Sequence, residues 1–189
     1  MNDQKIKGTY LRAANEFVNR RFSAKDRQRV FDMVTPEARA IQTRVDKAAW
    51  YPLPYVTTLF HGMETVNGDP TKTVNDIRAC GRFIAEEAAN TFLRLLLKVL
   101  TPKLFARQFP EFWRKYNSFG ELRTDLSRFD ENKVRFTVEG YDYVHCIGAG
   151  WIEFVFTSLG KIDVNVTTNV PLGTRSVPEV VWDVSWGDR

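Results

Sequence analysis

The side chains with the widest chemical scope in this sequence are two histidines and two cysteines: His61, His145, Cys80 and Cys146. His145 and Cys146 are adjacent, so they point apart on a regular element, and no further ligand follows at the spacing of a metal site. Cysteine is among the most buried residue types, and a single histidine on an apolar helix face usually packs. The sequence therefore nominates no catalytic residue and no metal ligand, and it indicates buried, reduced thiols.

Motifs of nucleotide-binding loops and nucleophile elbows are absent from the sequence. The chain contains no G-x-x-x-x-G-K-[ST], G-x-G-x-x-G or G-x-S-x-G, so these two kinds of site have no support. An enzyme acting on a small aromatic or lipid-like substrate would need a polar side chain directed into a pocket. His61, His145 and Tyr116 are the candidates for that role. Because no acid–base constellation is recognisable, we expect a protein that is not an enzyme.

Residues 95–123 combine aromatic and basic side chains, and a helical pattern separates the two kinds. The aromatic side is made of Phe105, Phe109, Phe112, Trp113 and Tyr116, and the other side of Lys103, Arg107, Glu111 and Arg114. Pro110 lacks a backbone N–H and clashes with the preceding helical turn, which predicts two short helices with a break near Phe109. The aromatic side is expected to face the core, and the basic side to be solvated.

The order of helices and strands indicates the fold class. Apolar residues recur at helical spacing over 6–21 and 70–99, and capping residues mark helices beginning near Ser23 and Thr35. The breaker-rich WYPLPY of residues 50–55 leads into another helix. The longest helix, 70–99, contains Gly81, which permits the close approach of a neighbouring element.

Beyond Gly120 the hydrophobic period changes to two. Strands are predicted over 121–129, 133–141, 161–170 and 179–186, with a helix over 146–160. The sequence thus predicts an α+β fold, in which an N-terminal helical layer packs on a four-stranded antiparallel sheet in the order ααα-ββαββ. We expect one domain over 1–189, with N-terminal helices over 1–49 and the rest of the core over 50–187.

Composition and charge narrow the class of partner. The 189 residues are 43% hydrophobic, enough for a core without disulfides, and no apolar run approaches the ~20 residues that span a bilayer. The first residues lack the apolar segment of a secretory signal, so a cytoplasmic location is expected. The net charge of +4 comes with interspersed acids, which indicates solvated helix faces.

A nucleic-acid platform on the expected hairpin is the alternative that the basic residues raise. Its members would be Arg123, Arg128, Phe129, Lys133, Arg135, Phe136 and Tyr141. Acidic neighbours such as Glu121 and Asp130 would repel phosphate, which supplies most of the affinity for nucleic acid. Nucleic acid is therefore disfavoured as a partner.

Three stretches of the chain resemble a known family. They are CGRFIAEEAANTFLRLLLKVLTPKLFARQFPEFWRKYNSFGELR, GWIEFVFTSLG and VWDVSW, which lie in this order within residues 50–187. The family consists of uncharacterised domains expanded in myxobacteria. It is similar to the superfamily of TRAPP subunits, vinyl-reductase-type domains and heme–nitric-oxide-binding domains. The resemblance implies a TRAPP-like helix-on-sheet fold that dimerises or holds a hydrophobic ligand, as a sensory or interaction module in bacterial signalling.

The family's cofactor sites are matched only in part. Heme–nitric-oxide-binding domains carry Y-x-S-x-R, which holds the heme propionates, and an axial histidine on the preceding helix. Tyr116 and Ser118 fit the first two positions, but Gly120 stands where arginine is required, and residues 70–99 contain no histidine. Vinyl-reductase-type domains carry a cysteine-rich metal site, which Cys80 and Cys146 alone do not reproduce. The resemblance therefore implies the scaffold without either cofactor, and no cofactor is expected.

The favoured hypothesis is a non-enzymatic module that binds a small hydrophobic or lipid-like ligand. Its pocket would lie between helix 70–99, the aromatic segment and the sheet, lined by Phe92, Leu96, Phe109, Trp113, Tyr116 and Trp151. A tightly packed core would use the same residues, so plain core is the structural alternative. A homodimer or protein partner, a heme-based gas sensor and an enzyme on an aromatic or lipid-like substrate remain open.

Overall fold

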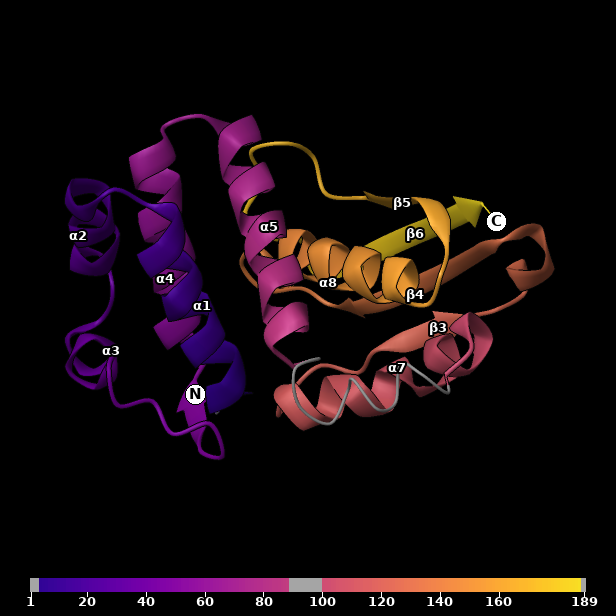
Figure 1. Ribbon diagram of the computed structural model, residues 1–189, viewed down its shortest axis with the longest axis horizontal. Helices are drawn as coiled ribbons and strands as arrows, with labels where there is room; N and C mark the ends of the chain where they lie inside the picture. The colour runs from indigo at the N-terminus through magenta and orange to yellow at the C-terminus, as the bar shows by residue number, and fades with distance from the viewer. Residues whose placement is uncertain (1–3, 89–99, 188–189) are drawn as a thin grey trace.

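The computed structural model describes residues 4–88 and 100–187 and has an α+β architecture (Figure 1). The helices are α1 (Gly8–Arg21), α2 (Ala24–Asp32), α3 (Pro36–Ile41), α4 (Pro54–Asn67), α5 (Pro70–Ala88), α7 (Pro102–Tyr116), α8 (Val144–Ser158) and the 3-10 helix η2 (Phe129–Glu131). The strands are β1 (Lys5–Lys7), β2 (Trp50–Pro52), β3 (Arg123–Asp125), β4 (Lys133–Glu139), β5 (Ile162–Thr168) and β6 (Glu179–Gly187). The predicted fold class is confirmed, including the four-stranded antiparallel sheet.

The sheet has the order β3-β4-β6-β5, and its register places alternate residues on one buried face. On β4 the buried residues are Val134, Phe136 and Val138; on β6 they include Trp182 and Val184. α8 packs against this face, and the Trp182 indole nitrogen donates a hydrogen bond to the His145 carbonyl oxygen at 2.9 Å. The period-two pattern therefore identified the strands, because one face is buried and the other solvated.

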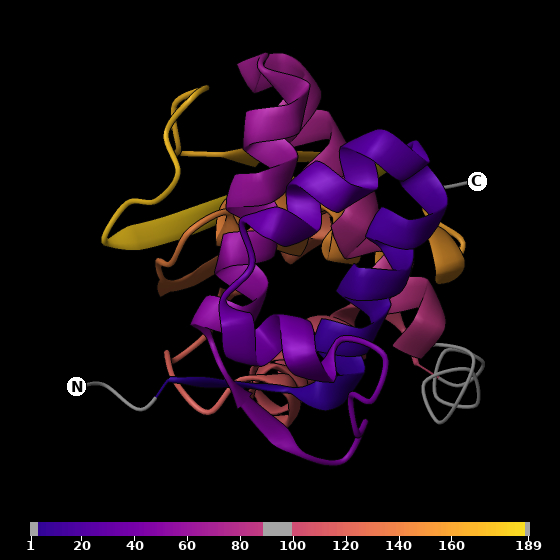
Figure 2. The ribbon, with the colours of Figure 1, turned by 90° about the vertical axis from the view of Figure 1, so that its left-hand side faces the viewer.

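The helical layer is assembled around α5, which separates α1 and α4 from α8 (Figures 1 and 2). The Ser23 and Thr35 side chains accept hydrogen bonds from the backbone N–H groups of Asp26 and Ala38, as the capping prediction requires. The described part of the long helix ends at Ala88, so the predicted continuation to residue 99 lies outside the described residues.

The close approach predicted for Gly81 is present where α5 crosses α8. A Cβ added to Gly81 would lie 2.2 Å from the carbonyl oxygen of Ile147, and one added to Gly150 would lie 1.9 Å from that of Arg78. Neither position therefore has room for a side chain. Two glycines thus set how closely the two central helices pack.

Two local predictions are corrected by the structure. Residues 5–7 form strand β1 before α1, and β1 pairs with β2 in a small sheet that the helical reading of 6–21 missed. The predicted break near Phe109 is also wrong, because α7 runs unbroken through Pro110. Pro110 cannot donate to the Ala106 carbonyl oxygen, but the Thr124 hydroxyl donates to that oxygen at 3.0 Å. A side chain of β3 thus replaces the missing backbone donor.

The outward face of the sheet carries charged side chains in cross-strand pairs. Arg135 donates two hydrogen bonds to Asp183, and Arg123 forms an ion pair with Glu179. Two members of the alternative nucleic-acid platform are buried: Phe136 on the opposite face of the sheet, and Tyr141 beyond the end of β4. This face is therefore charge-balanced rather than basic. Within the described residues, no helix is long and apolar enough to cross a membrane.

Candidate functional site

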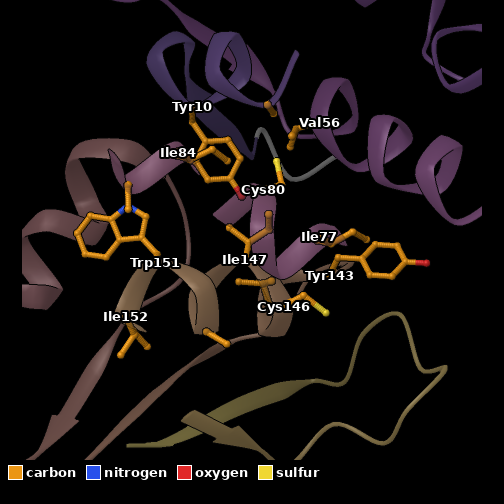
Figure 3. Close-up of a cluster of buried hydrophobic side chains, with 14 of the residues drawn as sticks. Tyr10, Val56, Ile77, Cys80, Ile84, Tyr143, Cys146, Ile147, Trp151 and Ile152 are labelled. Carbon is orange, nitrogen blue, oxygen red and sulfur yellow. The ribbon is translucent and has the colours of Figure 1, made fainter. Parts of the chain in front are cut away.

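A small apolar cavity lies where α1, α5, α7 and α8 meet. Its volume is about 40 Å³. The described residues that line it are Tyr10, Ile84, Phe109, Phe112, Trp113, Tyr116, Asn117, Tyr141, Val144, Ile147, Gly148 and Trp151. Figure 3 shows Tyr10, Ile84, Ile147 and Trp151 around this region of the core. Because these lining side chains are uncharged, the cavity suits a neutral guest.

Stacked aromatic rings form one wall of the cavity. The Phe109 and Trp151 rings are nearly parallel, with centroids 5.3 Å apart, and Phe136 meets Phe109 edge-on at 4.9 Å. The Trp113 indole nitrogen donates to the carbonyl oxygens of Phe119 and Gly120, both at 3.1 Å, which fixes the orientation of its ring. The wall is therefore preorganised by packing and by hydrogen bonds.

Two buried polar groups belong to the lining residues: the Tyr10 hydroxyl interacts with the Tyr141 hydroxyl, and the Asn117 Oδ1 atom accepts no hydrogen bond. Tyr10 and Asn117 are only 5% and 4% exposed. A buried polar group without a partner costs about 1–3 kcal/mol, so such groups call for an explanation. The arrangement provides a hydroxyl and an amide oxygen beside an otherwise apolar space, which is the usual composition of a small-molecule site.

Burial keeps the cavity tyrosines protonated. It raises the pKa of Tyr10 well above its ordinary value, with the neighbouring Tyr141 adding to the effect. Burial likewise raises the pKa of Tyr141 to about 12 and raises the pKa of the half-buried Tyr116. These phenols therefore act as neutral hydrogen-bonding groups near pH 7.

The structure brings together four of the six predicted site residues. Phe109, Trp113, Tyr116 and Trp151 all line the cavity, while Phe92 and Leu96 lie outside the described residues. The role of all six residues in ligand binding stays a prediction. Sequence reasoning missed Tyr10, Asn117 and Tyr141 as lining residues. Asn117 had a local signal, since it is a polar residue at the end of an aromatic helix, whereas Tyr10 had none beyond the apolar side of its helix.

The histidines and cysteines serve packing and pairing outside this cavity. His61 lies on α4, and its Nε2 is 2.6 Å from Asp142 Oδ2, so it has a specific partner rather than packing alone. His145 is buried at the start of α8, and burial lowers its pKa to about 4. Cys80 and Cys146 are buried free thiols, and burial raises the pKa of both. No group of three potential metal ligands occurs among the described residues.

The turn after α7 contains the residues that match the heme-binding motif. The Ser118 hydroxyl accepts a hydrogen bond from the Lys5 backbone N–H at 2.9 Å, and thus holds β1. Gly120, at the arginine position, has φ +68°, a left-handed conformation that strains any residue with a Cβ. The departure from the motif is therefore built into the backbone.

The fold places the chain among known proteins. No protein-family model matches the sequence, and no curated protein matches it. Solved structures do match: the unliganded Fe(II) H-NOX protein of K. algicida has a TM-score of 0.76 at 10% identity, over 97% of this chain and 98% of that chain. The Fe(II)NO H-NOX protein of S. oneidensis has a TM-score of 0.71 at 10% identity, over 97% of this chain and all (100%) of that chain.

A third similar structure is an oxygen-binding H-NOX domain related to soluble guanylate cyclases. Its TM-score is 0.63 at 10% identity, over 97% of this chain and 96% of that chain. The chain therefore has the fold of H-NOX domains, so the heme–nitric-oxide-binding part of the resemblance agrees with the structure. The myxobacterial, TRAPP and vinyl-reductase parts of the resemblance stay predictions.

Proposed function

We propose that the protein is a sensory domain with the H-NOX fold that binds a small neutral molecule in the aromatic cavity. The observation that carries this proposal is a buried acceptor without a partner, Asn117 Oδ1, in the lining of an otherwise apolar cavity. A guest with one hydroxyl would donate to Asn117 Oδ1, while its apolar body contacts Phe109 and Trp151. We propose a binding role without catalysis.

Heme-based gas sensing is the second candidate. The similar structures support it better than they support a hydrophobic ligand, because those proteins are H-NOX proteins described in iron-bound or gas-bound states. Tyr116 and Ser118 also occupy two positions of the heme-binding motif. In this reading a diatomic gas would be the signal.

The residues of this chain do not fit heme. The cavity volume of about 40 Å³ is far below the roughly 300–1,000 Å³ typical of cofactor sites. No histidine, cysteine or methionine is among the described lining residues, and residues 89–99 contain none of the three. We therefore derive no function through heme.

The test uses the intrinsic fluorescence of Trp113 and Trp151, which line the cavity. Purified protein would be titrated with methanol and with ethanol, which share a hydroxyl and are small enough for a cavity of about 40 Å³. We expect a saturable change with at least one probe. In the Asn117→Leu variant, which removes the acceptor, the affinity should fall about fivefold, because one hydrogen bond is worth about 1 kcal/mol. A Tyr51→Phe variant, whose changed side chain does not line the cavity, serves as control.

A parallel titration with hemin tests the second candidate. The proposal predicts no Soret band that saturates at one heme per chain. Saturation at one heme per chain, with neither hydroxyl compound bound, would overturn the proposal in favour of heme-based sensing.

A further inference from the structure

The small sheet formed by β1 and β2 lies beside the start of α1 and has one buried and one outer face (Figure 1). The two strands are antiparallel, with Lys7 opposite Trp50 and Lys5 opposite Pro52. Successive residues of a strand point to opposite faces, so these four side chains share the outer face. Ile6, on the inner face, is fully buried, whereas Trp50 is 39% exposed.

The loop that leads into β2 is held against the first turn of α1. The N–H groups of Gly8 and Thr9 donate to the carbonyl oxygens of Ala49 and Lys47, at 2.8 Å and 3.1 Å. Lys47 is therefore fixed next to the small sheet. Arg12 lies one helical turn beyond Thr9 on the same side of α1, and both Arg12 and Lys47 are exposed.

The same two segments carry the excess positive charge of the chain. Residues 4–12 and 42–52 contain five basic residues and one acidic residue, so their charge equals the net charge of the whole sequence, +4. The rest of the sequence is therefore balanced in charge. A local field of one sign attracts partners of the opposite sign, which indicates an anionic partner for this region.

Four of the five basic residues are available to such a partner. Within residues 4–88 and 100–187, no ion pair involves Lys7, Arg12, Arg44 or Lys47. The neighbouring acids are engaged: Asp46 Oδ1 accepts a hydrogen bond from the Ala48 N–H at 2.8 Å, and Glu16 pairs with Arg20. We call the four cations together with Trp50 the basic patch.

Trp50 adds an aromatic ring to these cations. The Lys7 Nζ atom lies 4.6 Å from the centroid of the Trp50 ring, so the ammonium group covers one side of the indole. This contact disfavours the stacking of a nucleic-acid base on the ring. An exposed indole among lysines suits the headgroup region of a bilayer, where tryptophan is enriched.

We propose that the basic patch docks on a bilayer surface that contains anionic phospholipids. The cations contact the lipid phosphates and carboxylates, while Trp50 and the neighbouring Pro52 enter the headgroup region. Each lysine or arginine near such a surface strengthens binding about fivefold, and salt screens this attraction. The docking does not depend on the ligand proposed for the aromatic cavity.

Co-sedimentation of the purified protein with lipid vesicles tests the proposal. Vesicles of phosphatidylcholine alone are compared with vesicles that also contain phosphatidylserine, at low and at high salt. Binding to the phosphatidylserine vesicles alone, weakened at high salt, is the expected result. Equal binding to both kinds of vesicle, or to neither, would overturn the proposal. Binding of a fluorescent oligothymidylate in the absence of vesicle binding would overturn it in favour of nucleic acid.

Charge variants assign the binding to the basic patch. Arg12→Gln combined with Lys47→Gln should weaken vesicle binding about 25-fold, because each cation contributes about fivefold. Lys25→Gln combined with Arg107→Gln is the matched control, since it removes two exposed cations from α2 and α7, and should leave binding nearly unchanged. Equal weakening in the two double variants would show that only the net charge matters, and would overturn the assignment.

A variant of the aromatic ring tests the orientation of the docked protein. Trp50→Ala should weaken vesicle binding about fivefold, because the apolar surface of the indole is then no longer buried in the headgroup region. Leu172→Ala is the control, since Leu172 is 64% exposed but lies in the loop between β5 and β6. Weaker binding in Leu172→Ala than in Trp50→Ala would contradict docking through the basic patch.

Discussion

At the scale of single residues, the buried Tyr10 hydroxyl interacts with the buried Tyr141 hydroxyl. Tyr10→Phe leaves the Tyr141 hydroxyl without this neighbour and should lower the free energy of unfolding by about 1 kcal/mol. Tyr51→Phe provides the comparison, because the Tyr51 hydroxyl accepts a hydrogen bond from the Asp46 N–H at 3.0 Å and its loss should lower stability by a similar amount. Urea unfolding measures both. A gain of stability in Tyr10→Phe would contradict this pairing of the two tyrosines.

His145 should make stability depend on pH. Burial lowers its pKa from 6.5 to about 4. Between these two pH values His145 is therefore protonated in the unfolded chain and neutral in the folded protein. The contribution to stability is therefore complete above pH 6.5 and is lost as the pH falls toward 4. Between about pH 7.5 and pH 5 the loss is about 2 kcal/mol.

The His145→Gln variant removes this contribution. Its free energy of unfolding should fall about 2 kcal/mol less than that of the wild type over the same pH range, as measured by urea unfolding. Identical pH profiles for the two proteins would show that the pKa of His145 is the same in the folded and unfolded states.

At the scale of elements, Gly81 controls the packing of α5 on α8. A Cβ at this position would lie 2.2 Å from the Ile147 carbonyl oxygen, so Gly81→Ala should cost about 2–3 kcal/mol. Gly68→Ala is the control, since Gly68 has φ +66° but open space around it, and only a conformational cost of about 1 kcal/mol is expected. Chemical unfolding compares the two. A smaller cost at Gly81 than at Gly68 would contradict the close packing of these helices.

The continuity of α7 depends on β3. Thr124→Val removes the donor to the Ala106 carbonyl oxygen and should cost about 1 kcal/mol. In the Pro110→Ala variant the backbone N–H of residue 110 can donate to the Ala106 carbonyl oxygen instead. Thr124→Val should therefore lower the stability of that variant by only about half as much as it lowers that of the wild type. A double-mutant cycle measures this coupling, and additive effects would show that the threonine does not compensate for the proline.

The elements that the sequence could predict are those whose signals are local. Ser23 and Thr35 cap helices through contacts three residues away, and the alternation around Phe136 and Trp182 follows from one buried sheet face. The unbroken α7 was not predictable, because its Ala106 carbonyl is satisfied by Thr124 from another element. Strand β1 could likewise not be predicted from local signals, since its partner β2 lies more than forty residues away in the sequence.

At the scale of the whole molecule, the candidate site is assembled from distant parts of the chain. The aromatic wall was predictable because Phe109, Trp113 and Tyr116 recur on one side of a helix. The polar residues of the lining could not be predicted, because only the packing of α1 against the rest of the core brings Tyr10 and Asn117 to the same cavity. The expected homodimer and the cytoplasmic location stay predictions, as does the single domain over 1–189.

The central claim is that this H-NOX fold binds a small ligand directly and without heme. Native mass spectrometry of freshly purified protein, with an absorption spectrum of the same sample, tests it most directly. We predict a small extra mass that is lost on denaturation, and no Soret band. An extra mass equal to heme, accompanied by a Soret band, would contradict the claim and establish the gas-sensor alternative.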